Sequence, residues 1–214
     1  MNEGRPLSIA VPKGRILKAL APLFSRAGLD VGPLLADDRR LVRDDAAGRL
    51  RYVFLKPDDV PTYVEYGAVD LGIAGRDTLL EKRADLYTPL DLGIGRCRLA
   101  VAGPRGKRAP DVPRVATKYP RITAEFFAKK GIQAEVIPVS GSVELGPLVG
   151  LSDLIVDVVE TGKTLEENDL EVLETVAEVS TMLIANRAAY KLRAAEIRPL
   201  CEAIGRVVAE GKAA

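Results

Sequence analysis

The sequence predicts an α/β fold made of two similar α/β lobes with a ligand cleft between them, like a periplasmic binding protein. Short apolar segments alternate with amphipathic helical patterns along most of the 214 residues, which is typical of α/β sheets. Several short motifs of the first half also recur, in the same order, in the second half. Loops that follow the predicted strands are rich in glycine and charged residues, and open α/β folds bind ligands at such strand ends.

Seven apolar segments have the length and flanking turns of strands, and we expect mostly parallel sheets. They lie near residues 7–11, 51–55, 69–74, 96–102, 113–117, 134–139 and 153–159. The first strand precedes a helix in which Ile16, Leu20 and Phe24 share one face and Gly28 marks the end. A charged hairpin is expected near 35–50, a strand that returns to the first lobe near 179–186, and a final helical segment at 187–209.

Three motifs of the first half resemble motifs of the second half. Residues 9–13 resemble 115–118, residues 24–29 resemble 127–132, and residues 67–71 resemble 150–154. Chance similarity between ordinary α/β units is the alternative, but the shared order favours a repeated plan. We therefore expect one lobe from residues 1–92 plus 181–214 and a second from residues 93–180.

Composition excludes several classes of protein and site. The 31 basic and 30 acidic residues nearly cancel, which argues against a nucleic-acid-binding protein. Histidine is absent, so imidazole-based triads and His-ligated metal sites are excluded. We expect no membrane span and no signal peptide. Cys97 and Cys201 form no close-spaced pair, and a reducing, cytoplasmic location is the simplest interpretation.

The segment 154–165 (LIVDVVETGKTL) is the strongest functional signal. A buried strand passes into a loop of small residues that opens a helix, and backbone N–H groups at such a position suit a phosphate. Asp157 and Glu160 precede the loop, where they can reach the hydroxyl groups of a phosphorylated ribose. Asp157 occupies the position at which a nucleotide-binding P-loop requires glycine, so that motif is excluded. The alternative is an acidic strand end followed by an ordinary helix cap.

A second group of candidates follows the other predicted strands. Lys13, Gly14 and Arg15 combine two cations with a glycine at a helix start, where cations are unfavourable unless an anion compensates. Lys56 also follows a strand and is placed to meet a phosphate. Ser142 lies in a small-residue turn that either caps a helix or contacts pyrophosphate.

Together these motifs resemble the short form of ATP phosphoribosyltransferase over nearly the whole chain. The resemblance rests on residues 12–15 (PKGR), 69–75 (VDLGIAG), 93–100, 116–119 (ATKY), 141–145 (GSVEL) and 157–165. It implies an enzyme, a glycosyltransferase of the pentosyl class, that joins N1 of the adenine of ATP to C1 of phosphoribosyl pyrophosphate and releases pyrophosphate. This reaction is the first step of histidine biosynthesis, an amino-acid biosynthesis pathway.

The resemblance also implies roles for single residues. Asp157 and Glu160 are the implied catalytic residues. The implied phosphoribosyl pyrophosphate-binding residues are Glu160, Thr161, Gly162, Lys163, Thr164 and Ser142. The implied ATP-binding residues are Lys13, Gly14, Arg15, Arg39, Lys56 and Asp91. Relatives often carry Arg where this chain has Lys56, and lysine lacks the bidentate fork of arginine.

Cofactor and partners follow from the same resemblance. We expect Mg²⁺ held mainly through substrate phosphates, with no certain protein ligand. The chain ends too early for the extra regulatory domain of the long form. We therefore expect a dimer of this chain and a hetero-octamer with a regulatory subunit resembling histidyl-tRNA synthetase. The alternatives are a non-catalytic binding module for a phosphorylated metabolite and a phosphoribosyltransferase acting on another base.

Overall fold

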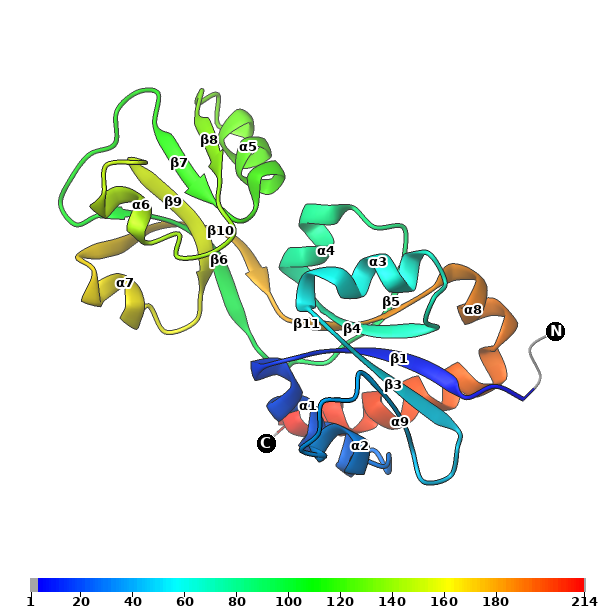
Figure 1. The fold of residues 1–214 in the computed structure, drawn as a ribbon. Coiled ribbons are helices and arrows are strands. Elements are labelled where there is room, and N and C mark those ends of the chain that lie inside the picture. The colour runs from blue at the N-terminus through cyan, green and yellow to red at the C-terminus, as the bar shows by residue number, and fades with distance from the viewer. Residues whose placement is uncertain (1–3, 214) are drawn as a thin grey trace. The chain divides into compact units, whose positions relative to one another are not determined.

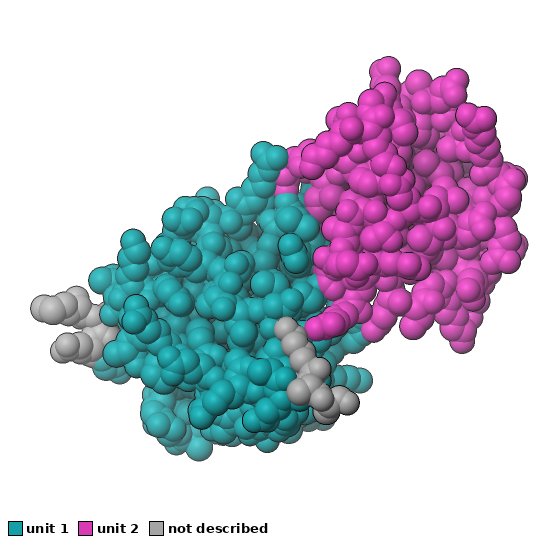
Figure 2. Space-filling model, turned by 180° about the vertical axis from the view of Figure 1, so that it is seen from behind, with its two compact units in different colours: residues 1–95, 180–214 teal, residues 96–179 magenta. Residues whose placement is uncertain are grey.

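The computed structural model describes residues 4–213, which divide into two compact units. Unit 1 is formed by Met1–Gly95 and Ser180–Ala214, and unit 2 by Arg96–Val179 (Figure 2). The lobe boundaries expected after residues 92 and 180 lie close to these limits. The expected ligand cleft stays a prediction. Within the described part of the chain, no helix combines the length and apolar character that crossing a membrane requires.

Unit 1 is built on a mixed sheet with the strand order β2-β3-β1-β4-β11-β5 (Figure 1). The strands are β1 (Leu7–Pro12), β2 (Val42–Asp44), β3 (Leu50–Leu55), β4 (Leu71–Gly75), β5 (Tyr87–Asp91) and β11 (Thr181–Ala185). Strand β1 pairs in parallel with β3 and β4, whereas β2 and β11 are antiparallel to their neighbours. The expected charged hairpin is β2 with β3, and the expected returning strand is β11.

Helices cover both faces of this sheet. They are α1 (Arg15–Arg26), α2 (Gly32–Leu35), the 3-10 helix at Pro57–Asp59, α3 (Val60–Glu65), α4 (Arg76–Lys82), α8 (Arg187–Leu192) and α9 (Ala194–Ala213). Leu20 and Phe24 of α1 and Ile204 of α9 lie in one buried cluster, and Val60 and Val64 of α3 lie in another. The C-terminal helix therefore packs on unit 1. Its apolar pattern is equally compatible with packing on a partner.

Unit 2 has a second mixed sheet, with the strand order β10-β6-β9-β7-β8. Its elements are β6 (Cys97–Pro104), β7 (Arg114–Thr117), α5 (Pro120–Lys129), β8 (Glu135–Pro138), α6 (Leu145–Leu148), β9 (Leu154–Val159), α7 (Lys163–Glu167) and β10 (Leu170–Val179). Helix α5 covers one face, where Phe127 is buried beside β7 and β9. The other face carries Val143, from the turn that precedes α6, and Leu165 of α7.

The expectation of mostly parallel sheets is wrong, because antiparallel strands complete both sheets. Strand β7 is parallel to β8 and β9, but β6 is antiparallel to β9 and β10 is antiparallel to β6. The chain passes from β5 to β6 and later from β10 to β11, so each unit incorporates a strand that arrives from the other. Periodicity shows that a segment is a strand but not its direction.

The two units share one strand order. The series β3-β1-β4-β11-β5 of unit 1 corresponds to β8-β7-β9-β6-β10 of unit 2, and β2 extends unit 1 alone. The repeated motifs fall on corresponding elements, since Ile9 pairs with Leu71 in unit 1 and Val115 pairs with Leu154 in unit 2. The prediction of two similar α/β lobes is confirmed.

Matching hydrogen bonds accompany the matching topology. The first helix of each unit ends at a glycine with positive φ, Gly28 at 78° and Gly131 at 71°. In both cases the next N–H donates back to a buried phenylalanine carbonyl, Leu29 to Phe24 and Ile132 to Phe127, at 3.0 Å. Only glycine adopts this backbone region without strain, which explains why it recurs at both helix ends.

Asp70 connects the first strand of unit 1 to the C-terminal helices. Its side chain is 2% exposed and accepts hydrogen bonds from Arg5 at 2.6 Å, from the Ser8 backbone at 2.9 Å and from Arg193 at 2.9 Å. Burial by itself raises the pKa of Asp70, but hydrogen bonds from Arg5 and Ser8 outweigh that effect and lower the pKa. In unit 2, Asp153 takes the corresponding bond from the Arg114 backbone at 2.8 Å.

Replacing Asp70 by asparagine is expected to lower the free energy of unfolding by about 3–5 kcal/mol, because Arg5 loses a carboxylate partner and the buried Arg193 keeps only one of its two, Glu196. The carboxylate has a lowered folded-state pKa, so its contribution to stability is present at neutral pH and is lost as the pH falls below about 4. The stability of Asp70→Asn should therefore depend less on pH in that range. Urea unfolding at several pH values measures both effects. The exposed Asp37→Asn is the control, and equal stability of the two variants would contradict the prediction.

Candidate functional site

The phosphate-loop candidates of unit 2 lie at one edge of its sheet. Strands β8, β7 and β9 run parallel, so their carboxyl ends meet at the same edge. The turn containing Ser142 follows β8, Lys118 follows β7, and the loop 160–164 follows β9. Parallel pairing therefore brings together residues that are far apart in the sequence.

Buried residues on both sides hold the loop 160–164 in position. Val159 is 6% exposed and Leu165 is 7% exposed, whereas Glu160, Thr161, Lys163 and Thr164 are exposed. Gly162 has a φ of 81°, and its carbonyl accepts the first hydrogen bond of the helix, from Glu166, at 3.0 Å. Helix α7 has only 5 residues, so its dipole is small. Any attraction for an anion comes mainly from the unsatisfied N–H groups of its first turn.

The two candidate carboxylates occupy different environments. Asp157 lies within β9, opposite Ala100 of β6, and is half-buried. Its Oδ1 accepts a hydrogen bond from the Val158 backbone at 2.8 Å, which restrains the side chain. Glu160 is the first residue after β9 and is exposed. The edge therefore offers one restrained and one accessible carboxylate close to an amide-rich turn.

Ser142 adopts an unusual backbone conformation. Its φ of 48° lies in the left-handed region, which non-glycine residues rarely occupy. Its carbonyl accepts a hydrogen bond from Leu145 at 3.1 Å, and the adjacent Val143 is 3% exposed. The exposed serine is therefore held in place by a buried neighbour at the start of α6.

The ATP-binding candidates of unit 1 gather at the equivalent edge, where β3, β1 and β4 end. The Lys13 N–H donates to the Leu55 carbonyl at 3.0 Å, so Lys13 lies beside the end of β3, next to Lys56. Gly14 has a φ of 100°, a turn that a side chain would strain. Arg15 begins α1, and these candidates are all exposed. Three basic side chains therefore lie at this edge, and Asp58 and Asp59 come shortly after Lys56 there.

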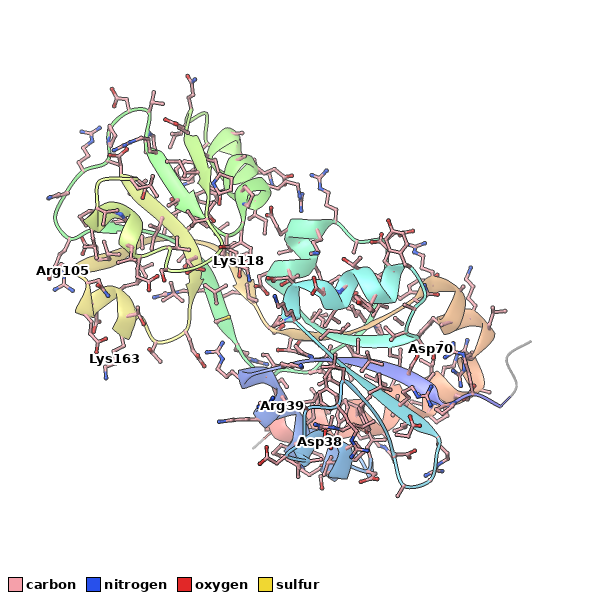
Figure 3. All side chains as sticks on the ribbon, viewed as in Figure 1. Asp38, Arg39, Asp70, Arg105, Lys118 and Lys163 are labelled. Atoms are coloured by element: carbon pink, nitrogen blue, oxygen red, sulfur yellow. The ribbon has the colours of Figure 1, made fainter. Side chains whose placement is uncertain are left out.

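Arg39 lies on the exposed segment that leads into β2 (Figure 3). The Leu41 carbonyl accepts a hydrogen bond from Phe54 at 2.8 Å, so this segment runs beside the carboxyl end of β3, close to Lys56. The segment is organised by Asp38, which binds Arg40 at 2.7 Å and Arg43 at 2.9 Å. The hydrogen bonds from Arg40, followed by that from Arg43, lower the pKa of Asp38 to about 2.

Asp91 ends β5 and contacts both segments through which the chain leaves and re-enters unit 1. Its Oδ1 accepts a hydrogen bond from the Gly93 backbone at 2.8 Å, and its Oδ2 accepts one from Ser180 at 2.9 Å. Sequence reasoning did not find this bracing role, because Ser180 lies 89 positions away. These two hydrogen bonds give Asp91 a structural role that does not depend on a nucleotide.

Two cations at these edges were also missed as candidates. Arg76 begins α4 directly after β4, and its N–H donates to the Ser180 carbonyl at 2.9 Å. Lys118 follows β7, the strand between β8 and β9. The available signal was the same in both cases, a basic residue immediately after a predicted strand.

Side chains alone form no preassembled metal cage in the described part of the chain. No group of three or more His, Cys, Asp or Glu residues with metal-binding geometry occurs among the described residues. Asp157 and Glu160 supply hard oxygen donors at the phosphate edge. Such a sparse donor set fits a divalent cation that keeps substrate oxygens and waters as ligands.

A groove of about 1400 Å³ lies at the opposite end of the unit 1 sheet. It is lined by residues at the amino ends of β1, β3 and β4, among them Leu7, Leu50 and Asp70, and by Leu192 and Arg193. Two of its charged groups, Asp70 and Arg193, bind each other. The groove is therefore separate from the edges that carry the candidate residues.

Comparison with known proteins identifies the family. The family model described as HisG, ATP phosphoribosyltransferase, matches residues 56–206. The ATP phosphoribosyltransferase of Sorangium cellulosum is 75% identical over 92% of this chain and 94% of its own length. That of Geobacter metallireducens is 50% identical over 92% of this chain and 96% of its own length.

Two solved structures resemble the fold. The ATP phosphoribosyl transferase (HisG:HisZ) complex from Thermotoga maritima contains a chain with a TM-score of 0.83 and 34% identity, covering 95% of this chain and 99% of its own. The periplasmic aliphatic sulphonate binding protein SsuA from Escherichia coli has a TM-score of 0.61 at 13% identity, covering 99% and 75%, which shows likeness of fold alone. The chain belongs to the ATP phosphoribosyltransferase family and carries out that family's reaction, the first step of histidine biosynthesis.

Proposed function

We propose that the two sheet edges divide the substrates, with ATP at the edge of unit 1 and phosphoribosyl pyrophosphate at the edge of unit 2. Loop 160–164 supports the second assignment, because its amides and threonine hydroxyls suit a terminal phosphate. The cations Lys13, Arg15, Lys56 and Arg39 support the first, since a triphosphate needs several positive partners. Asp91 stays a candidate for the adenine side.

The chemistry assigns distinct tasks to the residues of unit 2. In the reaction the C1–O bond of the ribose breaks, its electron pair leaves with pyrophosphate, and the N1 lone pair of adenine forms the new C1–N bond. Positive charge develops on the ribose, which a carboxylate such as Asp157 stabilises. The loop from Glu160 to Thr164 holds the 5-phosphate through its backbone N–H groups and threonine hydroxyls, and the Glu160 carboxylate accepts from ribose hydroxyls. Neutral adenine N1 needs no histidine base.

A divalent metal, which we propose to be Mg²⁺, completes the phosphoribosyl pyrophosphate site. Oxygens of the substrate would hold most of it, and Asp157 and Glu160 would be the carboxylates available to contribute. The metal supplies positive charge at the leaving pyrophosphate. The carboxylates would then orient the ribose and compensate the charge of the cation at the same time.

Thr164→Ala or Glu160→Gln is expected to raise the KM for phosphoribosyl pyrophosphate about 10- to 100-fold, the loss of one charge-assisted hydrogen bond. The dissociation constant of ATP should stay the same, because these residues belong to unit 2. The KM is measured from the rate of pyrophosphate release in the presence of both substrates and Mg²⁺. The dissociation constant of ATP is measured by calorimetric titration. Thr175→Ala and Glu166→Gln are matched controls in the same unit. Equal losses for both substrates would refute the division between the edges.

Lys56→Ala should raise the dissociation constant of ATP about 10-fold, because a charge-assisted contact with a phosphate is lost. Lys56→Arg should bind ATP at least as tightly as the wild type, since guanidinium adds a bidentate fork. Ribose 5-phosphate binding should change in neither variant. Titration at fixed ionic strength provides the measurement, with the exposed Lys191→Ala as the control. Unchanged ATP binding by Lys56→Ala would remove this residue from the site.

We also propose that the chain works in a hetero-oligomer with a regulatory subunit resembling histidyl-tRNA synthetase. The chain covers 99% of the Thermotoga chain taken from a HisG:HisZ complex, so the compared parts are of similar extent. A hetero-octamer that contains dimers of this chain is the expected assembly. Feedback by histidine would then reside in the partner.

Adding the regulatory subunit is expected to produce a larger species in analytical ultracentrifugation and to make pyrophosphate release sensitive to histidine. The isolated chain should be insensitive to histidine, because inhibition requires a site on the partner. A comparison of initial rates with and without histidine, for the chain and for the mixture, tests both statements. Inhibition of the isolated chain would contradict the proposal.

A further inference from the structure

Lys118 occupies the middle position of the unit 2 edge. It follows β7, which lies between β8 and β9 (Figure 3). The last paired residues, Thr117 of β7 and Val156 of β9, put Lys118 beside Asp157 in the continuing register. On the other flank, the Val139 N–H donates to the Thr117 carbonyl at 2.9 Å and starts the turn towards Ser142. The lysine therefore lies between the two small-residue turns of the edge.

The backbone on both sides of Lys118 is tightly held. Thr117 is 0% exposed, and its hydroxyl donates to the Val156 carbonyl at 2.7 Å and accepts from the Tyr119 N–H at 2.9 Å. The Thr117 hydroxyl also lies 3.3 Å from that of Thr123 on α5. Tyr119 is 5% exposed and belongs to the cluster under α5. Lys118 is exposed, and the two buried residues on either side of it fix the position of its backbone.

The order of elements across the edge matches the order of groups in phosphoribosyl pyrophosphate. Helix α7, after the phosphate loop, packs against β10. Moving across the sheet from there, Asp157 comes on β9, then Lys118 after β7, then Ser142 after β8. A substrate with its 5-phosphate in loop 160–164 and its ribose at Asp157 brings its pyrophosphate to Lys118 and Ser142.

Charge supports the same placement. Lys163 is the one basic residue of loop 160–164, and its Nζ lies 3.7 Å from Glu167 with the side chain 78% exposed. Asp157 and Glu160 add negative charge to the edge. A pyrophosphate group bound there is stabilised, in addition to the metal, by a cation from another element, and Lys118 is the basic residue that the adjacent strand supplies.

We propose that Lys118 binds the pyrophosphate group of phosphoribosyl pyrophosphate and stabilises the charge that develops on it as the C1–O bond breaks. This proposal rests on the assignment of phosphoribosyl pyrophosphate to unit 2. The corresponding turn of unit 1 carries Lys13, and both lysines are the first residue after their strand. Because Val115 aligns with Ile9, Lys118 aligns with Pro12, one position before Lys13. Each unit thus presents a lysine after the strand that lies between its two parallel neighbours.

The test is calorimetric titration of the chain, in its assembly and with Mg²⁺, with inorganic pyrophosphate, ribose 5-phosphate and phosphoribosyl pyrophosphate. Lys118→Met is expected to weaken binding of pyrophosphate and of phosphoribosyl pyrophosphate about 10- to 100-fold. Ribose 5-phosphate binding should be unchanged, and Lys118→Arg should recover most of the loss. Lys107→Met, which removes the same charge from a loop at the opposite end of the sheet, is the control.

The titrations distinguish a failure of the Lys118 proposal from a failure of the substrate assignment on which it rests. Equal weakening of all three ligands by Lys118→Met would mean that the lysine only maintains the edge, and unchanged pyrophosphate binding would remove it from the site. Both results overturn the proposal. If the assignment of phosphoribosyl pyrophosphate to unit 2 is itself wrong, a different result is expected. The Thr164→Ala variant will then bind ribose 5-phosphate as tightly as the wild type. The pyrophosphate titration still decides the role of Lys118 in that case.

Discussion

Parallel pairing of neighbouring strands is the constraint on which both candidate sites depend. Because β3, β1 and β4 run in one direction, as do β8, β7 and β9, their carboxyl ends meet at a single edge in each unit. The loops that follow these strands therefore lie at the edge, where their backbone groups can bind ligands. Reversing one of these strands would move its following loop to the opposite end of the sheet and dismantle the site.

The two edges share a plan but differ in charge. Unit 1 presents Lys13, Arg15 and Lys56 around the start of α1, which suits a ligand that carries several phosphates. Unit 2 combines Asp157 and Glu160 with an amide-rich loop, which suits a sugar that carries both hydroxyls and phosphate. Under the proposed division of the substrates, one repeated scaffold with different loops would serve two different ligands.

Sequence reasoning succeeded where the signal is local. The strand at 154–159, the helix end at Gly28 and the repeated motifs were all found, because periodicity and backbone preference act within a few residues. It missed β10, an edge strand of 10 residues in which polar or exposed side chains such as Thr175 and Glu174 hide the strand pattern. It also missed the bond between Asp91 and Ser180, which joins positions far apart in the chain.

The sequence by itself determined the α/β class, the repeated plan and the residue types of the two candidate loops, because these depend on residue types and short spacings. Only the tertiary structure decided which strands are antiparallel and that Lys118 lies between Asp157 and the Ser142 turn. It also decided that Asp70 holds Arg5 and Arg193 together inside unit 1. These features depend on strand order and direction, which are set by the packing of distant segments and leave no periodic trace in the chain.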